Sequence, residues 1–84
     1  MLIDKLIGGG TATAKDGTEV NFEVLVSMSF RGDDTIKAEI YEDNRLVEWE
    51  YFDENIDYED VLSWADEYYN YTANYQYFEE DEAE

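Results

Sequence analysis

The clearest pattern along the chain is an alternation of apolar and polar residues in its second quarter. One side of this stretch is entirely apolar and comprises Val20, Phe22, Val24, Val26, Met28 and Phe30. An alternation with a period of two residues is typical of a long antiparallel strand with one buried face. The preceding turn pair Asp16-Gly17 predicts a hairpin, with a shorter strand over Thr11 to Lys15 on its other side.

Two more strands are expected after this one. Ile36, Ala38 and Ile40 occupy alternate positions and predict a third strand that continues the buried face. The stretch from Arg45 to Phe52 predicts a fourth strand, in which one alternating set is Val47, Trp49 and Tyr51 and the other is Leu46, Glu48 and Glu50. We expect the Val47 set to face the core.

The last third of the chain has the period of a helix. Asp57 is a suitable N-cap, and Asp60 follows in the first turn, near the positive end of the helix dipole. Beyond Asp57 an apolar stripe recurs every three or four residues and comprises Tyr58, Val61, Leu62, Ala65, Tyr68, Tyr69, Thr72 and Tyr75. This spacing predicts one helix that continues to about residue 75.

Together these elements predict an α+β fold, in which an antiparallel meander of three to four strands packs against one C-terminal helix. We place a single domain over residues 1–78 and a disordered acidic tail over residues 79–84, where like charges repel one another. Gly8-Gly9-Gly10 is interpreted as a hinge. The N-terminus lacks the pattern of a signal peptide, and no apolar run reaches about 18 residues, so we expect a cytoplasmic protein.

The charge of the chain restricts its partners. The 84 residues include 23 acids and 5 bases, which gives a net charge of −18. All five bases precede residue 46, whereas residues 46–84 contain fourteen acids. Phosphate contacts need Lys and Arg, so direct binding to nucleic acid is excluded, and anionic membranes are excluded by the same repulsion. A basic partner, a cation, or a role of the charge in solubility alone remain.

Catalysis is not expected, and no cofactor is predicted. The chain has neither His nor Cys, so the most common general base and the thiol nucleophile are missing, and thiolate metal sites are excluded. The stretch from Asp53 to Asp60 spaces its oxygens like the start of an EF-hand loop, but Tyr58 replaces the turn Gly and Trp64 replaces the bidentate Glu. We therefore assign no metal ligand, and leave open a loose cation site or a solvated loop before the helix.

The acidic second half of the chain is also aromatic, with eleven of the fourteen aromatic residues at or after Trp49. Exposed aromatic rings beside carboxylates favour a protein interface. About 18 charges on a globule roughly 30 Å wide equal the charge of duplex DNA, at one per about 1.7 Å. We predict that the contact surface comprises acids and an aromatic anchor, namely Glu48, Glu50, Asp53, Glu54, Glu59, Asp60, Asp66 and Glu67 with Trp64 or Tyr71.

In size, acidity, scarcity of bases and α+β build, the chain resembles the small DNA-mimic inhibitors that phages use against restriction, CRISPR and repair enzymes. It is also similar to the acidic immunity proteins that neutralise nuclease toxins. The likeness is one of character and involves no motif, so it assigns no residue. It implies a non-catalytic inhibitor that binds the basic nucleic-acid-binding surface of a host or enemy protein, in a bacterial cytoplasm if phage-encoded. An immunity protein and a plain acidic interaction module are the alternatives.

Overall fold

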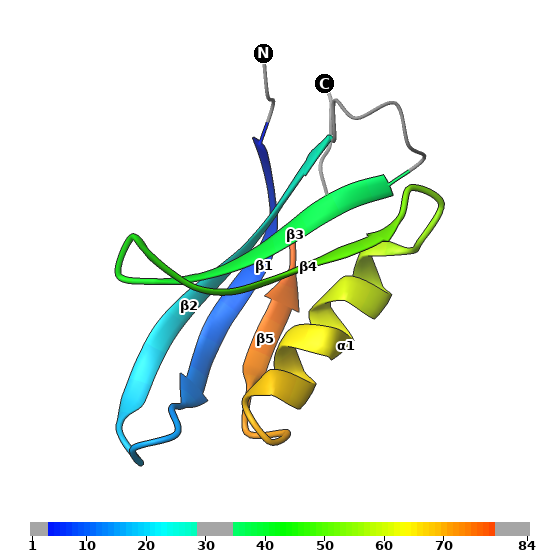
Figure 1. Cartoon of the computed structure of the whole chain (residues 1–84). Helices are drawn as coiled ribbons and strands as arrows, with labels where there is room; N and C mark the ends of the chain where they lie inside the picture. Colours follow the sequence, from blue (N-terminus) through cyan, green and yellow to red (C-terminus); the bar gives the residue numbers. More distant parts are fainter. Residues whose placement is uncertain (1–3, 29–34, 79–84) are drawn as a thin grey trace.

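The computed structural model describes residues 4–28 and 35–78. In chain order these form β1 (Asp4–Thr13), β2 (Glu19–Met28), β3 (Thr35–Glu42), β4 (Arg45–Asp53), α1 (Tyr58–Tyr68) and β5 (Asn74–Tyr77). Neighbouring strands are antiparallel and lie in the order β4-β3-β2-β1-β5 (Figure 1). The predicted α+β class, with an antiparallel sheet and one helix, is confirmed, whereas the fifth strand was not predicted.

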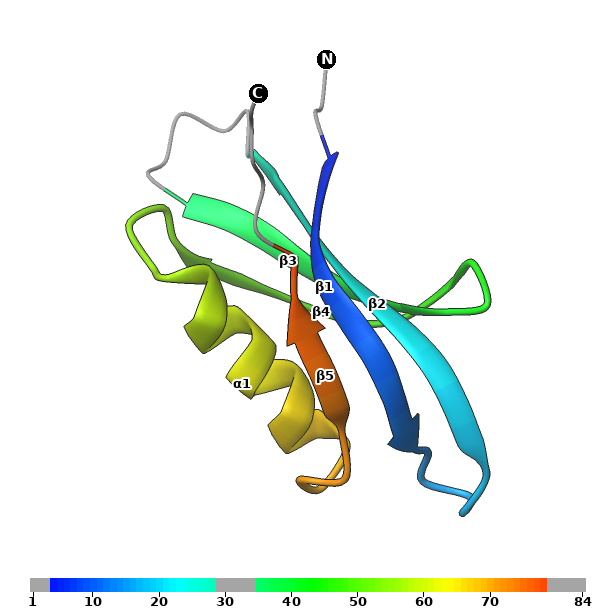
Figure 2. The ribbon, with the colours of Figure 1, turned by 180° about the vertical axis from the view of Figure 1, so that it is seen from behind.

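The path of the chain places the helix on one face of the sheet. β1 to β4 form a meander, in which each strand pairs with the next along the chain. α1 then leads from the edge at β4 to the opposite edge, where β5 pairs with β1 (Figure 2). The described residues therefore form two layers, and no described element covers the other face of the sheet.

The hydrophobic core lies between the sheet and α1. Its residues include those that the alternation predicted for β2 and β3, namely Phe22, Val24, Val26, Ile36, Ala38 and Ile40. The predicted stripe of the helix supplies Val61, Leu62 and Ala65. Each large apolar side chain buried in this way contributes about 1.5–3 kcal/mol to folding, so this shared interface holds α1 on the sheet. The side chains of Met28 and Phe30 lie outside the described part.

α1 starts after Asp57, as predicted, but it ends at Tyr68 rather than near residue 75. Asn70 adopts a left-handed conformation with a φ of 57°. The N–H of Tyr71 donates to the carbonyl oxygen of Asp66 at 2.8 Å, and the N–H of Asn70 donates to that of Glu67 at 3.0 Å. These two bonds form a Schellman motif, which ends a helix and reverses the chain. The predicted extension to Tyr75 is wrong, because β5 pairs with β1 instead.

The three consecutive glycines lie inside β1, and the prediction of a hinge is wrong. β1 pairs with β2 on one side and with β5 on the other over this stretch, which holds it as a strand. A Cβ atom at Gly8 would lie 2.6 Å from the carbonyl oxygen of Gln76 and 2.9 Å from Leu62 Cδ2. Glycine is therefore needed here because β5 and α1 approach the backbone of β1 too closely for a side chain.

β4 turns its acidic residues to the helix side of the sheet, contrary to the prediction. Directly opposed residues in a sheet share one face, and Glu48 and Glu50 lie opposite buried residues of β3. Trp49 and Tyr51 are 46% and 44% exposed and belong to the other face. Only Val47 of the predicted inward set packs against the core. It is the extra residue of a β-bulge, which breaks the simple alternation of faces.

Two predictions about the organisation of the chain are not tested by the structure. The acidic segment over residues 79–84 lies outside the described residues, so its disorder stays a prediction, as does the single domain over residues 1–78. In the part that is described, no helix combines the length and the apolar character needed to cross a membrane.

Candidate protein-interaction surface

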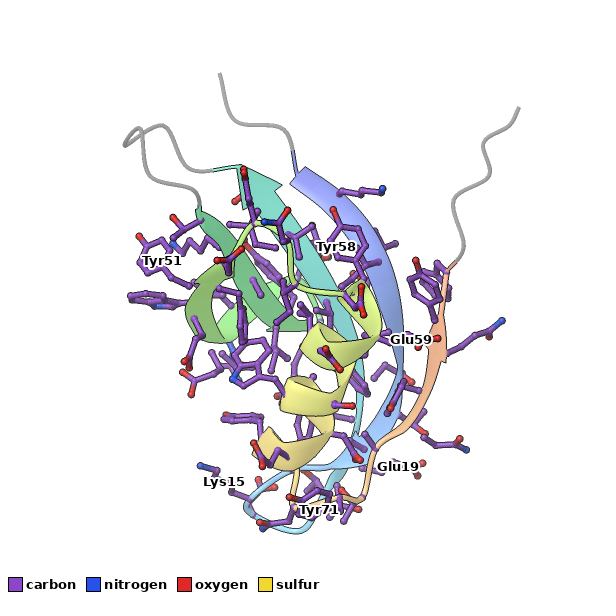
Figure 3. All side chains as sticks on the ribbon, turned by 90° about the vertical axis from the view of Figure 1, so that its right-hand side faces the viewer. Lys15, Glu19, Tyr51, Tyr58, Glu59 and Tyr71 are labelled. Atoms are coloured by element: carbon purple, nitrogen blue, oxygen red, sulfur yellow. The ribbon has the colours of Figure 1, made fainter. Side chains whose placement is uncertain are left out.

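Three of the predicted site residues, Glu59, Asp60 and Glu67, are exposed on α1. Glu59 and Asp60 are in its first turn, where unpaired backbone N–H groups create a partial positive charge that stabilises carboxylates. Asp60 and Glu67 are seven residues apart, which corresponds to about 10 Å along a helix. Figure 3 shows Glu59 on α1 and Tyr71 beyond the far end of the helix. The helix therefore holds these carboxylates at a fixed spacing.

Asp53 is exposed at the end of β4, and Glu54 is exposed in the loop that leads to α1. The N–H of Asn55 donates to Asp53 Oδ1 at 2.8 Å, and the N–H of Ile56 donates to the carbonyl oxygen of Asp53 at 3.0 Å. These bonds form an Asx turn that leads into the helix. Among the described residues, no group of three or more His, Cys, Asp or Glu could hold a metal ion. The two hydrogen bonds at Asp53 make this stretch a turn that leads into α1.

Trp64 on α1 and Glu48 on β4 both lie where the helix faces the edge strand. The ring of Trp64 on α1 packs edge-on against the ring of Phe52 on β4, with 5.4 Å between ring centroids. Farther along the helix, burial and the nearby charges of Glu42 and Glu48 raise the pKa of the Tyr68 phenol. Trp64 is partly buried against the core. It therefore joins α1 to β4 and is a poor candidate for the aromatic anchor.

Asp66 and Glu67 are neighbours with different surroundings. Asp66 Oδ1 accepts a hydrogen bond from the N–H of Ala73 at 3.1 Å, which holds the turn before β5. Glu67 is exposed, and its Oε2 accepts the hydroxyl of Tyr71 at 3.2 Å, a bond that raises the pKa of Tyr71. Asp66 thus has a structural role, and Glu67 together with Tyr71 remains at the surface.

Tyr71 is the most exposed large aromatic residue of the described chain, at 71%. Its φ of 64° lies in the left-handed region, which costs a residue with a Cβ atom about 1–2 kcal/mol. Strained backbone tends to occur at functional sites. Tyr71 is therefore the better of the two predicted anchors.

The lysines lie over aromatic rings rather than among the acids of the predicted site. Their Nζ atoms are 4.8–5.1 Å from ring centroids, in the pairs Lys5 with Tyr58, Lys15 with Tyr68, and Lys37 with Trp49. This distance is that of a cation–π interaction. Among the described residues one ion pair forms, between Lys37 Nζ and Glu39 Oε2 at 3.5 Å. No acid of the predicted site has a Lys or Arg partner within that part of the chain.

Sequence reasoning missed a group of exposed apolar residues on the face without the helix. Trp49 and Tyr51 pack edge-on with ring centroids 5.4 Å apart, and Leu46 lies near them on β4 with 41% of its surface exposed. The signal was present, since Glu48 and Glu50 alternate with the two aromatic residues. Only the register of β4 against β3 decides which set faces the helix.

An open groove of about 410 Å³ lies where the β1–β2 and β3–β4 turns meet, and it is lined by Ala14, Asp16, Thr18, Val20, Glu42, Asp43 and Arg45. Two of its carboxylates have structural partners. Asp16 Oδ1 accepts the hydroxyl of Thr18 at 2.7 Å, which lowers the pKa of Asp16, and Glu42 Oε2 accepts the hydroxyl of Tyr69 at 2.6 Å. None of the predicted site residues lines this groove.

No protein-family model, curated protein or solved structure matches this chain. The surface just described is therefore the only basis for proposing a function. Its residues form two groups. Glu48 and Glu50 lie on the helix side of β4, and the remaining acids follow the loop and α1 as far as Tyr71.

Proposed function

We propose that this chain is a non-catalytic inhibitor that binds the basic nucleic-acid-binding surface of another protein by DNA mimicry. It acts in the cytoplasm, that of a bacterial host if the chain is phage-encoded, and it needs no cofactor. The observation that supports this function best is the lack of cationic partners for the predicted acids among the described residues. Carboxylates without internal partners are available to Lys and Arg of another protein.

The charge density of the described part is consistent with this role. Its sixteen acids and four bases leave twelve net negative charges. Spread over the longest dimension of 39 Å, they give one charge per roughly 3.3 Å, and each strand of duplex DNA has one per about 3.4 Å. The net charge per unit length of the described part thus equals that of one DNA strand and is about half that of the duplex. The value expected from the sequence was higher because it divided the charge of the whole chain by a smaller diameter.

The spacing of the carboxylates supports the proposal as well. Glu48 and Glu50 share one face of β4 at about 6.7 Å along the strand. Asp60 and Glu67 follow α1 at about 10 Å. Both pairs are on regular elements that pack on a common core, so their order costs little entropy on binding.

Competition with DNA tests the proposed function. The immobilised chain is incubated with bacterial lysate, and bound proteins are eluted with a short DNA duplex at constant salt. Under DNA mimicry we expect the duplex to release the same nucleic-acid-binding proteins that a salt gradient releases. If the captured proteins stay bound to the chain while they also bind DNA, DNA mimicry is wrong, and an immunity protein that binds beside the active site is favoured.

Charge-neutral variants locate the contact surface. Asp60→Asn/Glu67→Gln removes two charges from α1, and Glu19→Gln/Glu23→Gln removes two from exposed positions on β2. We expect the α1 variant to weaken binding of the captured protein more than tenfold and the β2 variant less than threefold. The reason is that a carboxylate couples strongly only to a Lys or Arg of the partner that lies close to it. Asp66 stays unchanged, since its carboxylate holds the turn before β5. Equal losses would mean that net charge alone governs binding.

A further inference from the structure

β4 is an open edge of the sheet. Among the described residues it pairs with β3 on one side only, and it stands last in the strand order. From Glu48 to Asp53 its register against β3 is regular. Half of the backbone N–H and C=O groups along such a strand point away from the sheet, where another extended chain can pair with them. The edge therefore offers a row of backbone hydrogen bonds about six residues long.

One backbone donor on β4 has a weak side-chain partner. The N–H of Trp49 donates to Oε1 of the adjacent Glu48 at 3.3 Å. This acceptor is the carboxylate of a partly exposed side chain, and a backbone carbonyl of an added strand can replace it. The exchange also frees the Glu48 carboxylate for a cation.

The two faces of this edge differ in chemistry. On the helix side, Glu48 and Glu50 have no Lys or Arg partner within the described chain. On the other side, Trp49 and Tyr51 offer a ring pair, and the nearby Lys37 is already paired with Glu39. An added strand therefore meets uncompensated negative charge on one face and, on the other, an aromatic pair with Lys37 Nζ over the Trp49 ring.

We propose that the β4 edge binds an extended segment of the basic partner as an additional strand of the sheet. Lys or Arg at every second position of that segment pairs with Glu48 and Glu50, and the apolar residues between them contact Trp49 and Tyr51. This mode is β-augmentation, in which backbone bonds give affinity and alternate side chains give specificity. The inference rests on the proposed function, to which it adds the binding mode and the sequence pattern of the partner.

A second copy of this chain fits the same edge poorly. Pairing two β4 strands antiparallel about Trp49 places Glu48 of each copy opposite Glu50 of the other, on one face. Side chains opposed in this way are about 5 Å apart, and like charges at that distance are destabilising. Each copy also has a net charge of −18. Charge complementarity therefore selects a basic segment over self-association.

Labelled peptides of one composition test the proposal by fluorescence anisotropy. The first alternates four Lys with four Val, the second has the same residues in two blocks, and the third is the alternating peptide with N-methyl groups on the backbone nitrogens that would face β4. All three have the same charge, so electrostatic attraction to the acidic surface alone would give them equal affinity. Strand addition requires the alternating pattern and free N–H groups, so we expect the first to bind at least tenfold tighter than the others.

Two matched variants locate the peptide on the chain. We expect Glu48→Gln/Glu50→Gln to weaken binding of the alternating peptide at least tenfold, and Glu19→Gln/Glu23→Gln, with the same loss of charge at exposed positions on β2, less than threefold. Equal affinity for the three peptides, no binding of any, or a larger loss in the β2 variant would overturn strand addition. None of these results bears on DNA mimicry, which the competition with duplex DNA decides separately. A dimer in light scattering that Trp49→Pro dissociates would assign the edge to a second copy.

Discussion

Tyr71 allows the backbone of the proposed anchor to be tested apart from its side chain. Because its φ is positive, a Cβ atom at this position costs about 1–2 kcal/mol. We therefore expect Tyr71→Gly to be more stable than Tyr71→Ala by about 1 kcal/mol, although both lose the bond to Glu67. For a domain of this size, 1 kcal/mol shifts the Tm by about 4–8 °C. Urea denaturation and thermal melts of the two variants measure the difference.

Ser63 provides the matched control, because it is exposed within α1, where φ is helical. There the order is reversed, since Gly in a helix is about 1 kcal/mol less stable than Ala. Opposite signs at the two positions would isolate the effect of the left-handed backbone. If Ala were as stable as Gly at position 71, the strain at Tyr71 and the argument from it would be refuted.

The same variants separate stability from binding. If Tyr71 is the aromatic anchor, both Tyr71→Gly and Tyr71→Ala lose the ring and weaken binding of the captured partner more than tenfold, as expected for a central aromatic contact. Tyr71→Phe keeps the ring, so it should retain most of the affinity. A Tyr71→Gly variant that is more stable than Tyr71→Ala and equally weak in binding would show that the side chain serves the interface.

Three further predictions concern the fold. Gly8→Ala should cost about 1–3 kcal/mol and speed hydrogen exchange of the Phe78 amide, which donates to the carbonyl oxygen of Ile7 at 2.9 Å. Gly17→Ala meets no neighbour but has a φ of 91°, so it should cost about 1–2 kcal/mol and leave that amide protected. Burial and the bond to Glu42 raise the pKa of Tyr69 above its usual 10.0. The folded state thus keeps this phenol neutral, and the contribution of Tyr69 to stability is complete below pH 10. Stability falls above pH 10, where the phenol ionises in the unfolded chain. In Tyr69→Phe, stability measured by urea denaturation near pH 11 should therefore fall less steeply with pH. Raising salt from low to 300 mM should raise the Tm by about 4 °C or more, because the chain has a net charge of −18 and its acids repel one another. An unchanged Tm would mean that the acids are individually neutralised.

The sequence alone determined the parts of the fold that depend on local periodicity. The alternation in β2 and β3 identified Phe22, Val24, Ile36 and Ile40 as core residues, because a strand exposes successive side chains to opposite faces. Asp57 marked the start of α1, although its side chain makes no capping hydrogen bond, because carboxylates are favoured near the partial positive charge at a helix N-terminus. Net charge was equally direct, since it needs only a count of residues.

Only the tertiary structure decided the features that depend on partners distant in the sequence. The bulge at Val47 and the pairing of β4 with β3 placed Glu48 and Glu50 on the helix side, although either face was compatible with the alternation. The stripe through Thr72 continued past the end of the helix, because periodicity does not detect an Asn70 that ends it.

The candidate surface was likewise predictable from the sequence only in part. Its acids could be found from composition, yet their lack of cations could not, because the lysines reach rings that are distant along the chain, such as Lys15 over Tyr68 and Lys5 over Tyr58. The glycines of β1 were open to two interpretations until β5 was seen to pair beside them. Local propensity sets the period of each segment, whereas register, edges and close approaches arise from contacts between segments, and these decide which charges face outward.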